Sequence, residues 1–266
     1  MSETKDKGRR LVIRVGRQSM AFSTITEGSD VAYESYPFKA GISVAANMRE
    51  AIRTADILRG DYSSVLVMVD TEVMVVPAEE YSEQHAGLMY RHAFTGHEQH
   101  SLLSAVMPDL HAVVLFAVER DLQTVLADHW QRVRYVPSMM PVWHHLHQRS
   151  YTGPRAKLYV YFHDRQMDVF AFAKNRFRFC NAFDAVQADD ALYYLLSVWK
   201  QLGMEADRDE LYLVGELPGD TDFRAKAEEF IKRVYMISPV GEFNRAAPTR
   251  VSGMPYDVVT LYVKGL

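Results

Sequence analysis

Residues 158–179 read LYVYFHDRQMDVFAFAKNRFRF, which is the pattern of two apolar strands joined by a polar turn at residues 163–166. Short apolar runs bounded by polar turn residues are typical of buried strands. Residues 11–25, LVIRVGRQSMAFSTI, have nearly the same outline, with a turn that contains Arg17 and Gln18. The chain therefore uses one hairpin pattern twice, once near its beginning and once past its middle.

The residues around each hairpin extend this repeat. After the first hairpin, residues 31–38 form a third β-rich run, and Ser43 can cap a helix whose apolar residues recur at three- and four-residue steps. After the second hairpin, residues 176–182 alternate Phe with Arg, the period of a strand with one buried face. Residues 186–202 then form a helix with a broad apolar stripe. The sequence predicts an α/β protein built from two βββαβαβ halves.

The remaining elements follow from the same patterns. Further strands are expected at residues 65–69, 72–76, 111–119, 157–162, 167–173, 211–214 and 234–237, the second of them pairing with the first. Further helices are expected from residues 77–80 onward and at 121–130, 139–147, 222–234 and 255–263. The polar stretch before residue 111 is expected to be a loop. Gly153 and Pro154 interrupt the chain, so we expect one half at residues 1–150 and the other at residues 151–266.

Composition excludes several classes of protein. At 266 residues and 48% hydrophobic, the chain can bury a large core. Its net charge of -4 predicts no general attraction to nucleic acid or to anionic lipid. The single Cys180 excludes an intramolecular disulfide and suits the cytoplasm. No apolar run reaches the ~18 residues of a membrane helix, and no signal peptide is evident, so no membrane insertion is expected.

Duplicated halves around a linker resemble the actin-like ATPase superfamily, whose ribonuclease H-like halves occur in actin, heat-shock chaperones, sugar kinases and bacterial assembly ATPases. Over almost its full length, the chain more closely resembles an uncharacterised family of Bacteroidetes proteins with an actin-like ATPase fold. The stretches that carry this resemblance are LVIRVGRQSMAFSTI at 11–25, VMVVPAEEY at 73–81, YVPSMMPVWHHL at 135–146 and LYVYFHDRQMDVFAF at 158–172. The resemblance implies a nucleotide cleft between the two halves.

The resemblance also implies where phosphate and metal contacts would lie. In active members the first hairpin of each half carries an Asp closely followed by Gly. The carboxylate organises Mg²⁺, and the glycine turn lets backbone N–H groups approach phosphate. In the first half Arg14 stands at the position of the acid, followed by Gly16 and Arg17. In the second half Asp164 is present without an adjacent glycine, and Asp168 follows it.

The adenosine-binding loop is reduced in the same way. The family pattern of a small residue and two glycines reads here as Gly215 followed by Glu216, whose charge would repel a nucleotide. Candidate cleft-lining residues are therefore Arg14, Gly16, Arg17, Asp164, Asp168, Gly215 and Glu216. The simpler interpretation is plain turn chemistry and a solvated strand face for the two aspartates, and tight turns with positive φ for the two glycines.

Defects at three separate elements predict a pseudo-ATPase: a non-catalytic binding or scaffold protein with a protein partner and no cofactor. The alternative is a divergent ATP-binding enzyme or switch that uses the cleft between the halves. Fold resemblance alone supports that alternative.

Two other clusters resemble functional sites. His144 and His147 would share one helical face, as zinc ligands can, but no Cys or carboxylate is close in sequence to complete a site. His97 and His100 lack the spacing of the zinc protease motif. No tight metal site is expected, and Cys180 is expected to be a strand thiol rather than a nucleophile.

Overall fold

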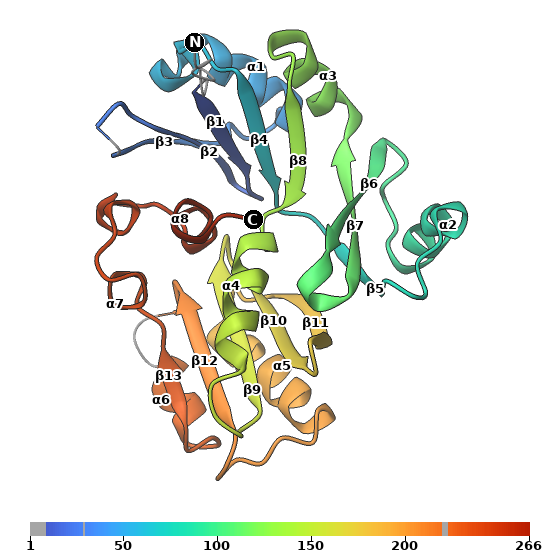
Figure 1. Ribbon diagram of the computed structural model, residues 1–266, viewed down its shortest axis with the longest axis vertical. Coiled ribbons are helices and arrows are strands. Elements are labelled where there is room, and N and C mark those ends of the chain that lie inside the picture. Colours follow the sequence, from blue (N-terminus) through green and yellow to red (C-terminus); the bar gives the residue numbers. More distant parts are fainter. Residues whose placement is uncertain (1–8, 29, 220–222) are drawn as a thin grey trace, which may run out of the picture.

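Two five-stranded sheets lie at opposite ends of the molecule, with helices between them (Figure 1). The computed structural model describes residues 9–28, 30–219 and 223–266. The first sheet has the order β3-β2-β1-β4-β8, formed by β1 (Arg10–Val15), β2 (Ser19–Ile25), β3 (Val31–Pro37), β4 (Ser64–Val69) and β8 (Val133–Pro137). The second has the order β11-β10-β9-β12-β13, formed by β9 (Lys157–His163), β10 (Gln166–Ala173), β11 (Arg176–Asp184), β12 (Glu210–Gly215) and β13 (Val234–Met236).

The two sheets share one arrangement of strand directions. In each, the first three strands form an antiparallel meander, and the last two run parallel to the first strand. Parallel neighbours need crossover connections, which explains why helices follow the meander in the sequence. This is the α/β order that the sequence predicted.

A third sheet interrupts the first half. It has the order β5-β7-β6, formed by β5 (Val73–Pro77), β6 (His100–Met107) and β7 (Ala112–Glu119). Helix α2 (Glu83–Ala93) packs on it through Ala86 and Tyr90. The sequence prediction was wrong here in three respects. Strand β5 pairs with β7 instead of β4. Pro77 ends β5 and residues 78–80 form a turn, so no helix starts at residues 77–80. Strand β6 lies within the stretch expected to be a loop.

The helices cover the sheets on both faces. The remaining helices are α1 (Val44–Thr54), α3 (Arg120–His129), α4 (Met140–Ser150), α5 (Ala188–Gln201), α6 (Phe223–Glu228), α7 (Pro239–Glu242) and α8 (Tyr256–Lys264), with short 3-10 turns at Asp56–Arg59, Pro108–Leu110 and Ala247–Arg250. Helices α1 and α3 lie above the first sheet in Figure 1, α5 and α6 lie on the second sheet, and α4 and α8 lie between the sheets. Among the described residues, no helix has the length and apolarity needed to cross a membrane.

Local sequence signals match most of these elements. The Ser43 side chain caps α1 by accepting from the Ala46 N–H at 3.1 Å, as predicted. Residues 255–263 were predicted to be helical, and α8 confirms this. The predicted helix 222–234 begins outside the described residues, and α6 ends well before residue 234. Strand β8 was not predicted.

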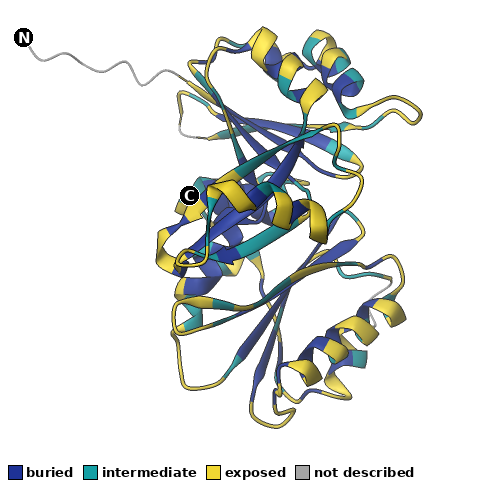
Figure 2. Ribbon diagram, turned by 90° about the vertical axis from the view of Figure 1, so that its right-hand side faces the viewer, coloured by how far each residue is buried: buried dark blue, intermediate teal, exposed yellow. Residues whose placement is uncertain are grey.

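Strand β9 shows why residues 158–162 are continuously apolar. Leu158, Val160 and Phe162 belong to the core beneath α5, whereas Tyr159 and Tyr161 belong to the core that the first sheet, α4 and α8 share. Both faces of the strand are therefore buried, as the dark strands of Figure 2 show. A strand buried on both faces reads as an unbroken apolar run.

Candidate functional site

Arg14 lies at the centre of a polar cluster between the two sheets. It stands near the end of β1 and is only 3% exposed. Its Nε donates to Asp257 Oδ2 of α8 at 2.6 Å, and its Nη1 donates to Asp164 Oδ2 of the β9–β10 turn at 2.8 Å. Its Nη2 lies 3.2 Å from His163 Nδ1. One buried guanidinium thus connects the first sheet, the second sheet and α8.

His163 extends the cluster into the second sheet. Its Nε2 lies 2.6 Å from Asp168 Oδ2, and its Nδ1 lies 3.8 Å from Asp70 Oδ2. Asp70 follows β4 directly, and Gln166 Nε2 donates to both of its carboxylate oxygens at 2.8 Å. We call the seven side chains the cleft network: Arg14, Asp70, His163, Asp164, Gln166, Asp168 and Asp257.

The cleft network shifts the pKa values of its own members. Burial alone would lower the pKa of His163, but hydrogen bonds to Asp164 and Asp168 and the nearby negative charges raise it to about 10. Burial would raise the pKa of Asp164, but the hydrogen bond to His163 and the Arg14 charge hold it well below its usual value. Burial raises the pKa of Asp70.

The protonation of His163 decides whether its contact with Arg14 is a hydrogen bond. The 3.2 Å approach of Arg14 Nη2 is a hydrogen bond only if Nδ1 is unprotonated, whereas the surrounding carboxylates favour the cation. We assign a proton to both nitrogens of the His163 ring, which makes it a cation. A neutral ring would leave the Arg14 guanidinium alone to balance the four carboxylates of the cleft network.

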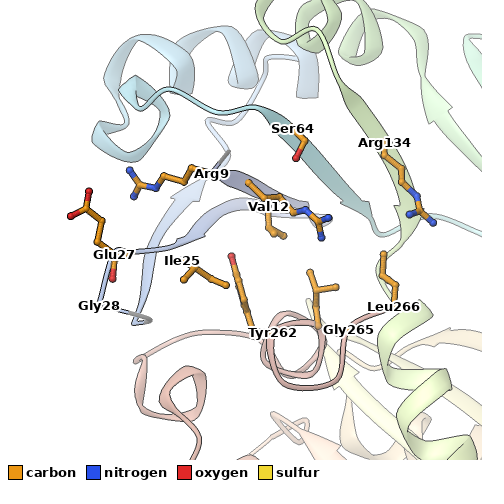
Figure 3. Close-up of a pocket in the computed structure, with 13 residues that line it drawn as sticks. Arg9, Val12, Ile25, Glu27, Gly28, Ser64, Arg134, Tyr262, Gly265 and Leu266 are labelled. Atoms are coloured by element: carbon orange, nitrogen blue, oxygen red, sulfur yellow. The ribbon is translucent and has the colours of Figure 1, made fainter. Parts of the chain in front are cut away.

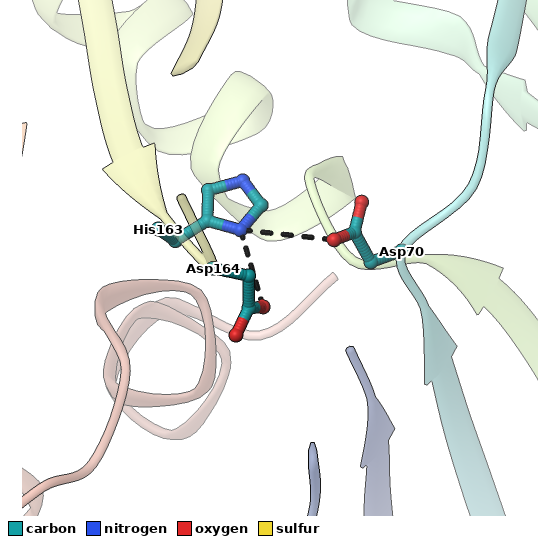
Figure 4. A group of neighbouring side chains, drawn as sticks. All are labelled: Asp70, His163 and Asp164. Atoms are coloured by element: carbon teal, nitrogen blue, oxygen red, sulfur yellow. Dashed lines mark hydrogen bonds and ion pairs between the residues drawn. The ribbon is translucent and has the colours of Figure 1, made fainter. Parts of the chain in front are cut away.

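Three of these side chains have the composition of a metal site. Figure 4 shows the carboxylates of Asp70 and Asp164 approaching the same nitrogen of the His163 ring, Nδ1. One ligand atom from each of the three residues lies within 4.8 Å of the others. Asp164 Oδ2 already accepts from the Arg14 guanidinium, however, and Arg14 Nη2 lies 3.2 Å from His163 Nδ1, the ring nitrogen that faces both carboxylates. A metal at this point would meet a fixed positive charge.

Gly16 is required by close packing against the cleft network. A Cβ at this position would lie 2.7 Å from Arg14 Nη1 and 2.7 Å from Asp164 Oδ2. Gly16 is not among the glycines with positive φ, so the expectation of a left-handed turn was wrong for it. That expectation was correct for Gly215, which has φ 91° and whose added Cβ would lie 2.0 Å from the Phe162 carbonyl oxygen.

The other candidate residues lie at or beyond the edge of this cluster. Arg17 is partly exposed and pairs with Asp184 of β11 at 3.1 Å, which adds a second link between the sheets. Glu216 is exposed, and within the described chain no hydrogen bond or ion pair joins its side chain to the cleft network. The structure therefore groups Arg14, Gly16, Asp164 and Asp168 but separates Gly215 and Glu216 from them.

A cavity of about 360 Å³ opens beside the cleft network. Asp70, Gln166 and Asp168 border it together with Arg17 and Asp184. Gln166 Oε1 is buried there without a hydrogen-bond partner. Carboxylates outnumber cations along this wall, so it suits a cation better than a phosphate.

Sequence reasoning missed four members of the cleft network: Asp70, His163, Gln166 and Asp257. Asp70 had a usable signal, because it directly follows a buried parallel strand, and the carboxyl ends of such strands commonly line sites. Asp257 lies in the first turn of α8, where an acid is ordinary, but it is fully buried and bonded to Arg14.

The histidines near Trp143 point to separate partners. His144 Nδ1 lies 3.3 Å from Asp109, His145 Nε2 lies 2.9 Å from Glu242, and His147 Nε2 lies 2.9 Å from the Tyr151 hydroxyl. Three rings with three different partners do not converge on one point. The Cys180 side chain of β11 is half-buried, and burial raises the pKa of its thiol well above the ordinary value, as in an unreactive thiol.

Comparisons with known proteins agree with this architecture. A Bacteroides thetaiotaomicron VPI-5482 protein with an actin-like ATPase fold and unknown function has a similar structure, with a TM-score of 0.85, 23% identity and 98% of each chain covered. A chain of the PilM-PilN type IV pilus biogenesis complex is similar at a TM-score of 0.59 and 11% identity, with 96% of this chain and 97% of that chain covered. No curated protein matches the sequence. The fold is thus that of the actin-like ATPases, and because residues 1–234 match the family described as a protein of unknown function (DUF3822), the chain belongs to that family.

Proposed function

We propose that this chain is a non-catalytic binding protein, a pseudo-ATPase in which protein side chains replace the metal and phosphate of a nucleotide cleft. The observation that carries the proposal is the buried Arg14 guanidinium, held by Asp257 and Asp164 where a metal-organising acid would be needed. Two arguments support it, one for the metal and one for the phosphate.

The metal argument concerns Asp164. A divalent ion bound there must displace the Arg14 guanidinium or accept a positive charge beside it. At these separations, like charges in a partly buried site repel strongly. Displacing Arg14 would also leave its charge buried and unpaired, which costs about 3–5 kcal/mol.

The phosphate argument concerns charge and backbone donors. The Gly16 N–H, which a phosphate-binding hairpin would present to its ligand, donates to the Ser19 carbonyl at 2.9 Å. The second hairpin turns through Asp164 and Arg165 with φ values of 46° and 63° and contains no glycine that could admit a phosphate. The four carboxylates of the cleft network would repel the anion itself.

The cleft network and the neighbouring Arg17–Asp184 ion pair connect the two sheets. Arg14 bonds to Asp164, Gln166 to Asp70, and Arg17 to Asp184, each across the cleft. We infer that residues 1–150 and 151–266 are the two halves of an internal duplication, and that the cleft network holds them in one arrangement without a nucleotide. A fixed arrangement suits a scaffold that presents surfaces to a partner.

A protein partner is the expected ligand, and the cytoplasm its expected location. PilM, which shares the fold, was solved in complex with PilN, so the fold supports protein binding in at least that case. A net charge of -4 gives no general attraction to nucleic acid.

A second candidate is a divergent ATP-binding enzyme or switch. The grouping of Asp70, His163 and Asp164 and the unpartnered Gln166 Oε1 favour it, since these atoms offer ligands to a cation if Arg14 moves away. It requires a rearranged cleft, whereas the pseudo-ATPase requires none.

A phosphate-release assay with Mg·ATP separates the two candidates. The wild type and an Asp164→Ala variant are expected to release phosphate at the same background rate. The exposed pair Arg17 and Asp184 offers a control, because Arg17→Ala leaves all seven side chains of the cleft network in place. Turnover in the wild type and in Arg17→Ala that disappears in Asp164→Ala would refute the pseudo-ATPase and favour the enzyme.

A further inference from the structure

A cavity of about 1190 Å³ lies between the first sheet and the C-terminal end of α8, away from the cleft network (Figure 3). We call it the α8 groove and define it by Arg10, Val12, Ile25, Arg134, Tyr262 and Leu266, which all line it. Val12 is buried in its floor, whereas Ile25 and Leu266 are 54% and 37% exposed. The groove thus combines an apolar floor with accessible apolar sides.

The groove exists because α8 covers only part of the sheet face. Alternation along β1 places Arg10, Val12 and Arg14 on the same face. The first turn of α8 contacts Arg14, because Asp257 accepts from its guanidinium. Further along the helix, the Tyr262 hydroxyl donates to Ser23 Oγ at 3.0 Å. The helix then ends at Lys264, so the face around Arg10 is left without a helix over it.

Positive charge flanks the apolar floor. Figure 3 shows Arg9 and Arg134 at opposite ends of the groove, with Val12 between them. In residues 9–28, 30–219 and 223–266, no carboxylate forms a salt bridge with Arg9, Arg10 or Arg134. Arg9 donates to Thr24 Oγ1 and lies over the Tyr62 ring at 5.5 Å. Glu27 lines the same end of the groove (Figure 3), but within the described residues no salt bridge joins it to Arg9, and the three arginines outnumber this one acid.

We propose that the α8 groove binds a segment of a partner protein in which apolar residues are flanked on both sides by acidic residues. At about 1190 Å³, the groove has room for a short peptide segment. The arginines at its two ends can each pair with a carboxylate in bidentate geometry, and the apolar floor between them matches apolar side chains.

The spacing of the charges argues against other anions. A single lipid headgroup or phosphate would meet only one end of the groove, and nucleic acid would need a continuous basic track where Val12, Ile25 and Leu266 lie. The carbonyl end of α8 carries partial negative charge, so the acidic residues are expected on the arginine sides rather than against Gly265.

The inference deepens the proposed function by naming the partner's chemistry, and it is tested separately. A random peptide library is selected on the full chain, and the enriched peptides are synthesised with a fluorophore and titrated by fluorescence anisotropy. We expect enriched peptides with apolar residues between acidic ones. The double variant Arg9→Glu, Arg134→Glu should bind them about tenfold or more weakly, because the charge-assisted contacts at both ends of the groove are reversed.

Matched variants control for folding and for net charge. Arg53→Glu with Arg91→Glu changes the same number of exposed arginines elsewhere and should leave the affinity within about twofold. The milder pair Arg9→Gln, Arg134→Gln keeps the experiment usable if the reversal unfolds the chain.

Three outcomes would overturn the inference: no enrichment of acidic peptides, equal affinity in the groove and control variants, or groove-dependent binding of labelled duplex DNA or phosphatidylglycerol vesicles instead of peptide. Micromolar binding of Mg·ATP would refute the proposed function while leaving the peptide result intact, so the two failures are distinguishable.

Discussion

Replacing Arg14 with Met is expected to lower the free energy of unfolding by about 3–5 kcal/mol. Met keeps much of the side-chain volume and removes only the guanidinium, so cavity formation adds little. What remains is a set of buried carboxylates without their cation: Asp257 is fully buried, and Asp164 keeps only His163 as a close positive charge.

The magnitude follows from the contacts that disappear. Arg14 makes charge-assisted hydrogen bonds at 2.6 Å and 2.8 Å, each worth about 1.5–3 kcal/mol when made and more when one partner is left buried alone. Adding Asp257→Asn to Arg14→Met removes one stranded charge and should recover part of the loss. Together with the Asp257→Asn single variant, the recovery would complete a double-mutant cycle and give the coupling between the two residues.

Urea unfolding followed by tryptophan fluorescence measures the effect, since the chain contains three tryptophans. Arg17→Ala is the matched control, because its ion pair with Asp184 is exposed at 43% and 80% and should be worth no more than about 0.5 kcal/mol. If Arg14→Met cost less than about 1 kcal/mol, the cleft network would be solvated, and the claim that its buried ion pairs hold the two sheets together would be refuted.

Three further substitutions test other parts of the account. Trp199→Ala should cost about 3–5 kcal/mol in urea unfolding, since the ring is 5% exposed in the core beneath α5; a loss under 1 kcal/mol would contradict that packing. Gly16→Ala should destabilise by about 1–3 kcal/mol because its Cβ would meet the cleft network at 2.7 Å, and an unchanged urea midpoint would show that the hairpin can shift. The pKa of His163 is raised to about 10, so its stabilisation is complete below its unfolded pKa near 6.5 and is lost as pH rises toward 10. Between pH 7 and 10, the free energy of unfolding of the wild type should therefore fall by roughly 1 kcal/mol per pH unit more than that of His163→Gln. If the two pH profiles ran parallel, the ring would not be protonated in this pH range.

Local patterns account for the elements that the sequence predicted. The meander of β9, β10 and β11 uses neighbouring residues, a polar turn and clear apolar periods, so each signal lies within one window of sequence. The elements it missed carry weaker signals. Strand β6 pairs with β7, the next strand in the sequence, but its first four residues are all of intermediate exposure, which blurs the alternation there. Strand β8 is five residues long and depends on a distant partner, because it pairs in parallel with β4.

The pairing of β5 fails for the same reason. Its apolar residues would suit either β4 or β7, and only the three-dimensional arrangement selects β7. A strand's own sequence indicates that it is buried but not which neighbour buries it.

The candidate site divides along similar lines. Arg14, Gly16, Asp164 and Asp168 could be found because they lie on two hairpins whose pattern is recognisable. Asp257 could not, since it lies 243 residues from Arg14 in the sequence and looks like an ordinary first-turn acid until α8 packs against the sheet. The cleft network is thus a tertiary feature assembled from locally unremarkable residues.

The most direct test of the central claim is a calorimetric titration of the full chain with Mg·ATP. Because Arg14 opposes the metal and the hairpin amides are already bonded, two or three contacts of about 1–3 kcal/mol each are missing, and the dissociation constant is expected to be millimolar or weaker. Micromolar affinity that disappears in Asp164→Ala would contradict the account and place the nucleotide in the cleft.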